Sequence, residues 1–171
     1  MTQGFTSGMR SSLDDTWTTP RDFFDKLHQE FNFTLDAAAL CSSAVVPNYL
    51  GPDHEYGWRQ DALTVEWEGA SEGGAVWLNP PYGRIIKEFV AKADTESKKG
   101  ITVVCLVPAR TDTKWWWDSC IHHEVRFIKG RLKFGGSANS APFPSMVVVF
   151  GGDTLYVPPK YGRMDCKGRE I

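Results

Sequence analysis

The sequence predicts an α/β fold with a mixed β-sheet. Segments with strand character alternate with segments of helical periodicity, which is typical of a sheet whose strands are joined by helices. The continuous apolar run ITVVCLVPA, residues 101–109, is typical of a buried central strand. Two later strand-like segments, residues 124–134 and 145–150, form a hairpin-like pair. We expect this pair to give the sheet an antiparallel edge strand.

The first half of the chain contains one clear helix. Residues 18–31, TTPRDFFDKLHQEF, open with a threonine N-cap candidate and Pro20 in the first turn, and apolar residues then recur at helical spacing. The short segment Phe33–Asp36 reads as a strand. Residues 51–74 are rich in turn formers, with a possible short element around Ala62–Val65.

The second half continues the alternation. Ala75–Leu78 reads as a short buried strand, and residues 84–100 place apolar side chains along one helical face before a glycine stop. Residues 111–121 read as a helix capped by Thr111, Asp112 or Thr113. This segment contains three successive tryptophans, residues 115–117. Because three successive helical residues cannot all face one core, at least one should be exposed or buried against DNA or a partner.

Length and composition fit one globular domain. The chain has 171 residues, of which 42% are hydrophobic, so we expect a single domain over residues 1–171. Residues 1–15 should form a mobile leader, and residues 151–171 a C-terminal extension. No apolar run is long enough to span a membrane and no signal peptide is recognisable, so we expect a cytoplasmic protein without a membrane partner. The four cysteines lack the spacing of a disulfide framework or a metal site.

Charge is distributed unevenly along the chain. Residues 1–79 contain 4 Lys and Arg against 12 Asp and Glu, whereas residues 80–171 contain 15 against 9. A basic face beside a cleft can attract a polyanion although the total charge is −2. A solvated basic surface without a partner agrees with these counts equally well.

Polar residues follow three of the predicted strands. Asp36 ends the first, Asn79 follows AVWL, and Arg110 follows ITVVCLVPA. Ligands bind outside the carboxyl ends of strands in open α/β sheets. These residues therefore indicate a ligand site at one edge of the sheet.

The stretch AVWLNPPYGR, residues 75–84, indicates a specific chemistry. Two prolines make a stiff, extended exit from the strand, which leaves backbone carbonyls free to accept hydrogen bonds. The Asn79 side-chain oxygen and the Pro80 carbonyl can each accept one proton of an amino group on a planar ring. This draws the nitrogen toward a tetrahedral shape and exposes its lone pair, while Tyr82 offers a face for stacking. The alternative is a proline-stiffened turn with Asn79 as a cap.

The ordered motifs resemble a known family. NPPY looks like the motif of S-adenosylmethionine-dependent amino-methyltransferases. The wider pattern TWTTP, FF, EFNFTLDAAA, DAL, VWLNPPYGR, LVPARTDTKWW, GRLKF, APFPS and VVVF is similar to the phage-type DNA adenine-N6 methyltransferases, the Dam-like family. The resemblance runs from about residue 17 to residue 150. It implies a compact Rossmann-like class I methyltransferase fold. It also implies an enzyme that transfers a methyl group from S-adenosylmethionine to adenine-N6 in double-stranded DNA.

The resemblance also implies roles for individual residues. The target adenine would be flipped out of the duplex onto the motif Asn79, Pro80, Pro81 and Tyr82. Asp36 would lie near the amino group of the cofactor and Asp61 near its adenine, although either could be a plain loop carboxylate. The TTP segment would contact the methionine end of the cofactor, although it reads equally well as a helix cap. The implied cofactor-binding residues are Thr18, Thr19, Pro20, Asp36, Ala37, Asp61 and Asn79, with Asp53 or Glu55 as guesses for the ribose.

The basic half supplies candidates for DNA contact. No separate recognition domain fits this length, so residues 110–117 and 130–144 would have to read any specific sequence. Phosphate contacts would make the affinity depend on salt. The candidates are Arg84, Lys87, Arg110, Lys114, Lys129, Arg131 and Lys133.

Two features keep alternatives open: the strand-end motif also serves methylation of amino groups in RNA or on protein glutamine, and the turn after the first strand departs from the wider methyltransferase pattern. Many methyltransferases have a glycine-rich turn after the first strand, but DAAALCSS, residues 36–43, contains no glycine. The alternatives are a methyltransferase that acts on RNA or on protein glutamine, and a catalytically inactive phage DNA-binding protein.

Overall fold

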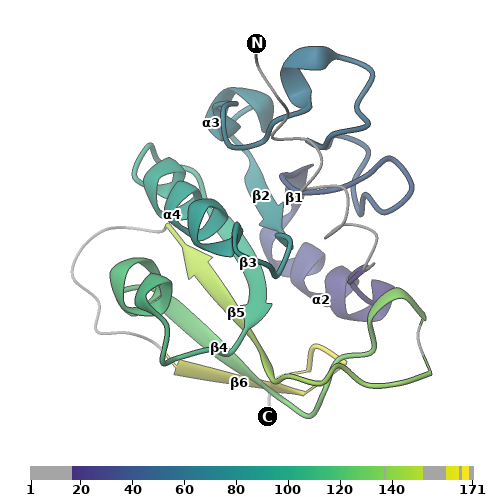
Figure 1. Ribbon diagram of the computed structural model, residues 1–171, viewed down its shortest axis with the longest axis vertical. Coiled ribbons are helices and arrows are strands. Elements are labelled where there is room, and N and C mark those ends of the chain that lie inside the picture. The colour runs from purple at the N-terminus through teal and green to yellow at the C-terminus, as the bar shows by residue number, and fades with distance from the viewer. Residues whose placement is uncertain (1–16, 137, 152–160, 166, 170–171) are drawn as a thin grey trace.

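Six strands form one mixed sheet in the computed structural model of this chain, which describes residues 17–136, 138–151, 161–165 and 167–169 (Figure 1). The strand order is β1-β2-β3-β5-β4-β6. The strands are β1 (Phe33–Asp36), β2 (Ala75–Leu78), β3 (Val103–Pro108), β4 (Glu124–Lys129), β5 (Ser145–Phe150) and β6 (Tyr161–Asp165).

The antiparallel strand lies inside the sheet. Strands β1, β2 and β3 pair in parallel, whereas β5 is antiparallel to β3 and to β4. The edge strand β6 pairs with β4 in parallel. The two late strands thus form the expected antiparallel pair, but the expectation of an antiparallel edge is wrong. All residues of β5 are buried, and a strand covered on both faces belongs in the middle of a sheet.

Helices flank the strands, with α2 and α4 the longest (Figure 1). In α2, Phe24 packs edge-on against Trp77 of β2, with ring centroids 5.5 Å apart. Helix α4 (Ile86–Ser97) packs against β3, β5 and the helical segment η2 (Trp116–Cys120). The guanidinium of Arg126 in β4 forms a bidentate pair with the carboxylate of Glu30 in α2, and both N–O distances are 2.6 Å. The helical segments are α2 (Arg21–Phe31), η1 (Gly57–Arg59), α3 (Trp67–Ala70), α4 (Ile86–Ser97), η2 (Trp116–Cys120) and η3 (Phe134–Gly136).

Strands β1 and β2 have the predicted bounds, and β3 lies within the predicted central strand with every residue buried. Strand β4 ends at Lys129 rather than at residue 134, because Gly130 turns the chain with φ of 89°. The short element expected at Ala62–Val65 is a turn, and the helical segment α3 comes just after it.

Two predictions about helices are wrong in detail. Helix α2 begins at Arg21 with Pro20 in the N-cap position, and no side chain caps it. The predicted threonine cap is therefore absent. The helix expected over 111–121 is present over residues 114–120, but it begins after a turn at residues 111–113 and is π-helical over η2. The Thr113 hydroxyl donates to the Arg110 carbonyl at 2.7 Å and stabilises that turn instead of capping an α-helix.

The expected leader, residues 1–15, lies outside the described residues. Strand β6 falls within the expected extension at residues 151–171 and belongs to the sheet. Within the described ranges, no helix is both long and apolar enough to cross a membrane.

Candidate active site

The loops that follow β1, β2, β3 and β4 emerge at one edge of the sheet. These four strands run in the same direction, because β5, which separates β3 from β4, is antiparallel to both. We call the side of the sheet where the carboxyl ends of these strands lie the carboxyl edge. It carries Asp36, Asn79 and Arg110, which lie at or after the ends of β1, β2 and β3. The loop after β4 also reaches the start of α2 (Figure 1), where Gly135 N–H donates to the Thr18 carbonyl at 2.8 Å.

The side-chain amide of Asn79 is held in one orientation. Its nitrogen donates to the Trp17 carbonyl at 2.6 Å and to Thr19 Oγ1 at 3.2 Å. If the amide were flipped, its oxygen would face the carbonyl oxygen of Trp17. The contacts therefore identify which amide atom is the nitrogen and which is the oxygen. The oxygen, Oδ1, is buried and has no hydrogen-bond partner in the part of the chain that the structure describes. The site thus contains a fixed, unoccupied acceptor.

A second acceptor follows directly. The Pro80 carbonyl accepts no hydrogen bond from the described residues, and both Pro80 and Pro81 are buried. Prolines restrict the backbone here, and Pro81 has no N–H to donate back. Asn79 Oδ1 and the Pro80 oxygen are therefore both free to accept protons from one ligand group.

Tyr82 differs from expectation, because its ring is not open for stacking. The ring is 8% exposed, and its hydroxyl donates to the Leu106 carbonyl at 3.3 Å. Burial raises the pKa of this phenol well above its ordinary value. The indole of Trp17 stacks on Tyr82 with centroids 6.2 Å apart and an interplanar angle of 24°.

Two phenylalanines complete an aromatic cluster around this pair. Phe134 and Phe143 present edges to Trp17 at centroid distances of 5.3 and 5.0 Å. Both also contact Tyr82, at 6.1 and 5.4 Å. We call Trp17, Tyr82, Phe134 and Phe143 the aromatic cluster. It joins the chain before α2, the NPPY motif and the loop after β4.

Asp36 is a buried carboxylate at the end of β1. Its two oxygens accept the N–H groups of Ala38, at 3.3 Å, and Val45, at 3.1 Å. Burial raises its pKa to about 6. No Lys, Arg or His of the described residues forms an ion pair with it. The adjacent Ala37 is fully buried, and its N–H donates to the Trp77 carbonyl at 2.9 Å.

The other acidic candidates bind their own loops. Asp53 accepts the Cys41 N–H at 2.9 Å, and Asp61 accepts the Leu63 N–H at 3.0 Å in a local turn. Neither is placed beside Asn79 by a described contact.

A glycine does lie against the turn after β1, but it comes from another segment. A Cβ on Gly51 would lie 1.6 Å from the Ala39 carbonyl oxygen, so only glycine fits there. Gly51 therefore allows a close backbone contact at this turn, but with the chain itself and not with a cofactor.

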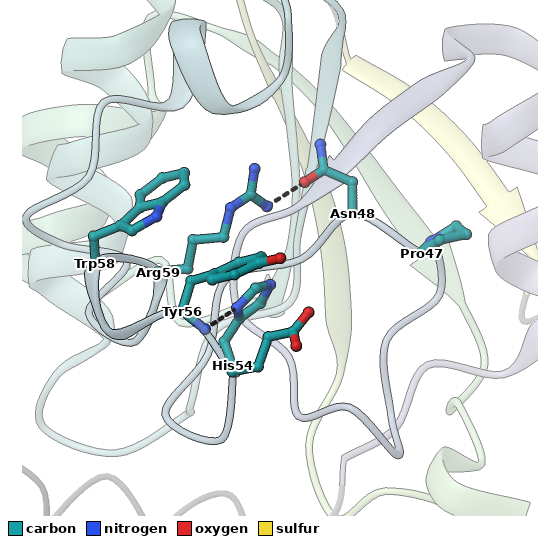
Figure 2. Close-up of a pocket in the computed structure, with 7 residues that line it drawn as sticks. Pro47, Asn48, His54, Tyr56, Trp58 and Arg59 are labelled. Carbon is teal, nitrogen blue, oxygen red and sulfur yellow. Dashed lines mark hydrogen bonds between the residues drawn. The ribbon is translucent and has the colours of Figure 1, made fainter.

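A cavity of about 470 Å³ lies beside residues 47–59 (Figure 2). Arg59 stacks on Trp58 at 4.6 Å and donates to Asn48 Oδ1, while Tyr56 N–H donates to His54 Nδ1 at 3.1 Å. Of the two guesses for a ribose contact, Glu55 lines this cavity and Asp53 does not. None of the residues that contact Asn79 lines it.

All seven basic candidates are exposed. Lys87 pairs with Glu88 and Lys114 with Asp118. The other five form no salt bridge with the described residues: Arg84, Arg110, Lys129, Arg131 and Lys133. These five lie in or next to loops of the carboxyl edge. The tryptophan prediction is confirmed, since Trp116 is 4% exposed and Trp117 is 57% exposed.

Sequence reasoning missed part of this arrangement. No role was foreseen for Trp17, Phe134 or Phe143, although all three lie within the quoted segments TWTTP, GRLKF and APFPS. The clustering of aromatics beside Gly and Pro in loops was the available signal. Thr19 was expected at the cofactor, but its hydroxyl faces Asn79.

Comparison with known proteins shows the family of the chain. The family model described as DNA N-6-adenine-methyltransferase (Dam) matches residues 6–151. A DNA N-6-adenine-methyltransferase of Escherichia phage T1 is 31% identical over 109 residues, covering 63% of this chain and 42% of that relative. The match thus spans less than half of the phage protein. Because the family model extends over most of the chain, the protein belongs to the DNA N-6-adenine-methyltransferase (Dam) family.

Proposed function

We propose that this protein transfers a methyl group from S-adenosylmethionine to the N6 amino group of an adenine in double-stranded DNA. The observation that carries the proposal is the buried, unpartnered oxygen of Asn79, held in place through its own amide nitrogen. A buried acceptor without a donor costs free energy, and such a cost is retained where a ligand supplies the donor. The phage T1 relative carries this activity in its name. The setting would be the cytoplasm of a bacterial or phage-infected cell.

The residues of the motif act by accepting protons and by fixing geometry. Asn79 Oδ1 and the Pro80 carbonyl each accept one N–H of the adenine amino group. This withdraws the nitrogen lone pair from the ring and directs it outward. Pro81 stiffens the turn, so both oxygens are already in position when the base arrives. No side chain of the site needs to form a covalent bond.

The proposed methyl donor is S-adenosylmethionine, and Asp36 is the residue that fits it. The cofactor supplies an electrophilic methyl group on a positively charged sulfur. It also carries an amino group, and a buried carboxylate without a cationic partner, as at Asp36, suits such a group. Ala37 leaves room beside that carboxylate. A compact Rossmann-like class I arrangement is the fold we propose around this site, because β1, β2 and β3 run parallel and end at one edge.

Double-stranded DNA is the proposed partner of the exposed basic loops. Five exposed basic residues lie at or after the carboxyl ends of the strands, on the same side of the sheet as Asn79: Arg84, Arg110, Lys129, Arg131 and Lys133. Positive charge there would hold phosphates beside the motif while the target base leaves the stack.

The test is transfer of a radiolabelled methyl group from S-adenosylmethionine to unmethylated plasmid DNA, with total RNA and a protein extract as parallel acceptors. We expect label in the DNA alone, recovered as N6-methyl-2′-deoxyadenosine after digestion to nucleosides. Label confined to RNA or to protein would refute the proposal. The Asn79→Ala variant is the control for a contaminating activity.

A further inference from the structure

Trp17 contacts the motif at Asn79 through its backbone and at Tyr82 through its ring. Its own backbone oxygen accepts the Asn79 amide nitrogen, and its ring stacks on Tyr82. Asn79 Oδ1 is buried and Tyr82 is 8% exposed, so neither is open to a flipped base in this arrangement. Something that now covers them has to move before a base can bind.

The contacts identify Trp17 as the residue that moves. Two hydrogen bonds join residues 17–19 to the motif, from the Asn79 amide to the Trp17 carbonyl and to Thr19 Oγ1, and a third joins Thr18 to Gly135 of the loop after β4. Thr19 keeps its contact with the Asn79 amide when Trp17 leaves. The Trp17 ring makes one stacked and two edge contacts with the aromatic cluster. A net hydrogen bond and an aromatic contact of this kind are each worth about 1 kcal/mol, so incoming groups can replace them.

We infer that Trp17 occupies the slot of the target base and gives it up when a purine enters. Indole and purine are both flat, fused rings of five and six atoms, so a slot that holds one has the dimensions of the other. The Trp17 carbonyl stands where a ring nitrogen of the purine would accept from the Asn79 amide. Asn79 would then bind the base through both side-chain atoms, a pairing typical of adenine.

This inference rests on the proposed function and narrows its substrate. A cytosine also offers an amino group beside a ring nitrogen, so hydrogen bonding alone does not exclude it. The size of the slot excludes cytosine, since a single ring leaves part of the space between Tyr82, Phe134 and Phe143 unfilled. An empty apolar space of that kind weakens binding. The aromatic cluster thus selects purines over pyrimidines.

The test uses Trp17→Ala, which vacates the slot, with adenosine and cytidine as the probes. We expect adenosine to bind this variant at least tenfold more tightly than wild type in calorimetric titration, and cytidine to show no such gain. Adenosine at about ten times its dissociation constant should raise the Tm of the variant by roughly 3 to 6 °C. Trp58→Ala, which removes an exposed tryptophan outside the cluster, should behave as wild type.

Equal adenosine affinity in a folded Trp17→Ala variant and in wild type would overturn the inference. If Trp17→Ala does not fold, 5-fluorotryptophan-labelled wild type serves instead, with the Trp17 resonance assigned from its absence in Trp17→Phe. Saturating adenosine should shift that resonance and leave the buried Trp67 unchanged; an unmoved Trp17 resonance overturns the inference. These readouts need no methyl transfer. A protein that binds adenosine as expected but labels no DNA would refute the proposed function alone.

Discussion

The amide nitrogen of Asn79 lies 2.6 Å from the backbone oxygen of Trp17, so a residue before the first helix orients the side chain that ends β2. The contact spans 62 positions of the sequence. It directs the amide nitrogen toward Trp17, so the amide oxygen is the atom left without a hydrogen-bond partner among the described residues.

This orientation predicts the outcome of two substitutions at Asn79. Asn79→Ala removes the acceptor and should lower methyl transfer by roughly 10²- to 10³-fold, the range for loss of one preorganised polar group. Asn79→Asp should be as inactive, because it turns a second oxygen toward the Trp17 carbonyl. Initial rates with labelled cofactor measure the loss. Calorimetry should show that Asn79→Ala retains its affinity for S-adenosylmethionine, and near-normal transfer by this variant would contradict the role given to the side chain.

Thr19 positions Asn79 without reaching the substrate itself. Its hydroxyl accepts from the Asn79 amide at 3.2 Å and is buried. Thr19→Val keeps the shape and removes the acceptor, so kcat should fall about tenfold, equivalent to one net hydrogen bond. Thr19→Ser should restore most of kcat, while KM for DNA stays near wild type in both variants. A Thr19→Ser variant as slow as Thr19→Val would show that packing, not the hydroxyl, matters.

The parts of the fold written in local sequence could be predicted, and the contacts between distant segments could not. β1 and β2 are short apolar runs bounded by polar residues, and their predicted bounds agree with the structure. The position of β5 depends on which strands it pairs with, and a buried apolar run fits beside β3 as well as beside β4. Its apolar pattern therefore indicated an interior strand but not its neighbours.

The same distinction applies to the site. Asp36 and Asn79 could be placed together because each ends a strand of a parallel pair. The meeting of Trp17 with Phe134 and Phe143 depends on the loop after β4 folding back to the start of α2. Loop aromatics have no periodicity that assigns them to a face, so their positions beside Gly and Pro mark them as loop residues but do not predict which of them meet.

The buried Asp36 makes stability depend on pH in a known direction. Its pKa is raised from 3.8 to about 6 by burial, so the folded state holds the proton more tightly than the unfolded state. Above pH 6 the charged Asp36 lowers the free energy of unfolding by about 3 kcal/mol. This cost disappears as the pH falls toward 3.8. Asn in its place does not titrate.

Urea unfolding of wild type and Asp36→Asn at pH 7.5 and pH 4.5 isolates this effect, because other carboxylates titrate alike in both proteins. Relative to Asp36→Asn, wild type should gain most of that free energy at the lower pH. A difference between the two proteins that is the same at both pH values would show that the Asp36 carboxyl titrates normally.

The basic loop after β4 should contribute to DNA affinity through phosphates alone. Arg131 and Lys133 are exposed and form no salt bridge with the described residues, and the loop that carries them also brings Phe134 to the motif. Each phosphate contact adds about 0.9 to the slope of log affinity against log salt. Arg131→Ala with Lys133→Ala should therefore reduce the slope, measured by fluorescence anisotropy on duplex DNA, by up to roughly 1.8. Lys98→Ala is the matched control, because Lys98 is exposed but lies at the end of α4 that precedes β3, away from the carboxyl edge. An unchanged slope in the double variant, or an equal reduction in the control, would place the DNA on another face.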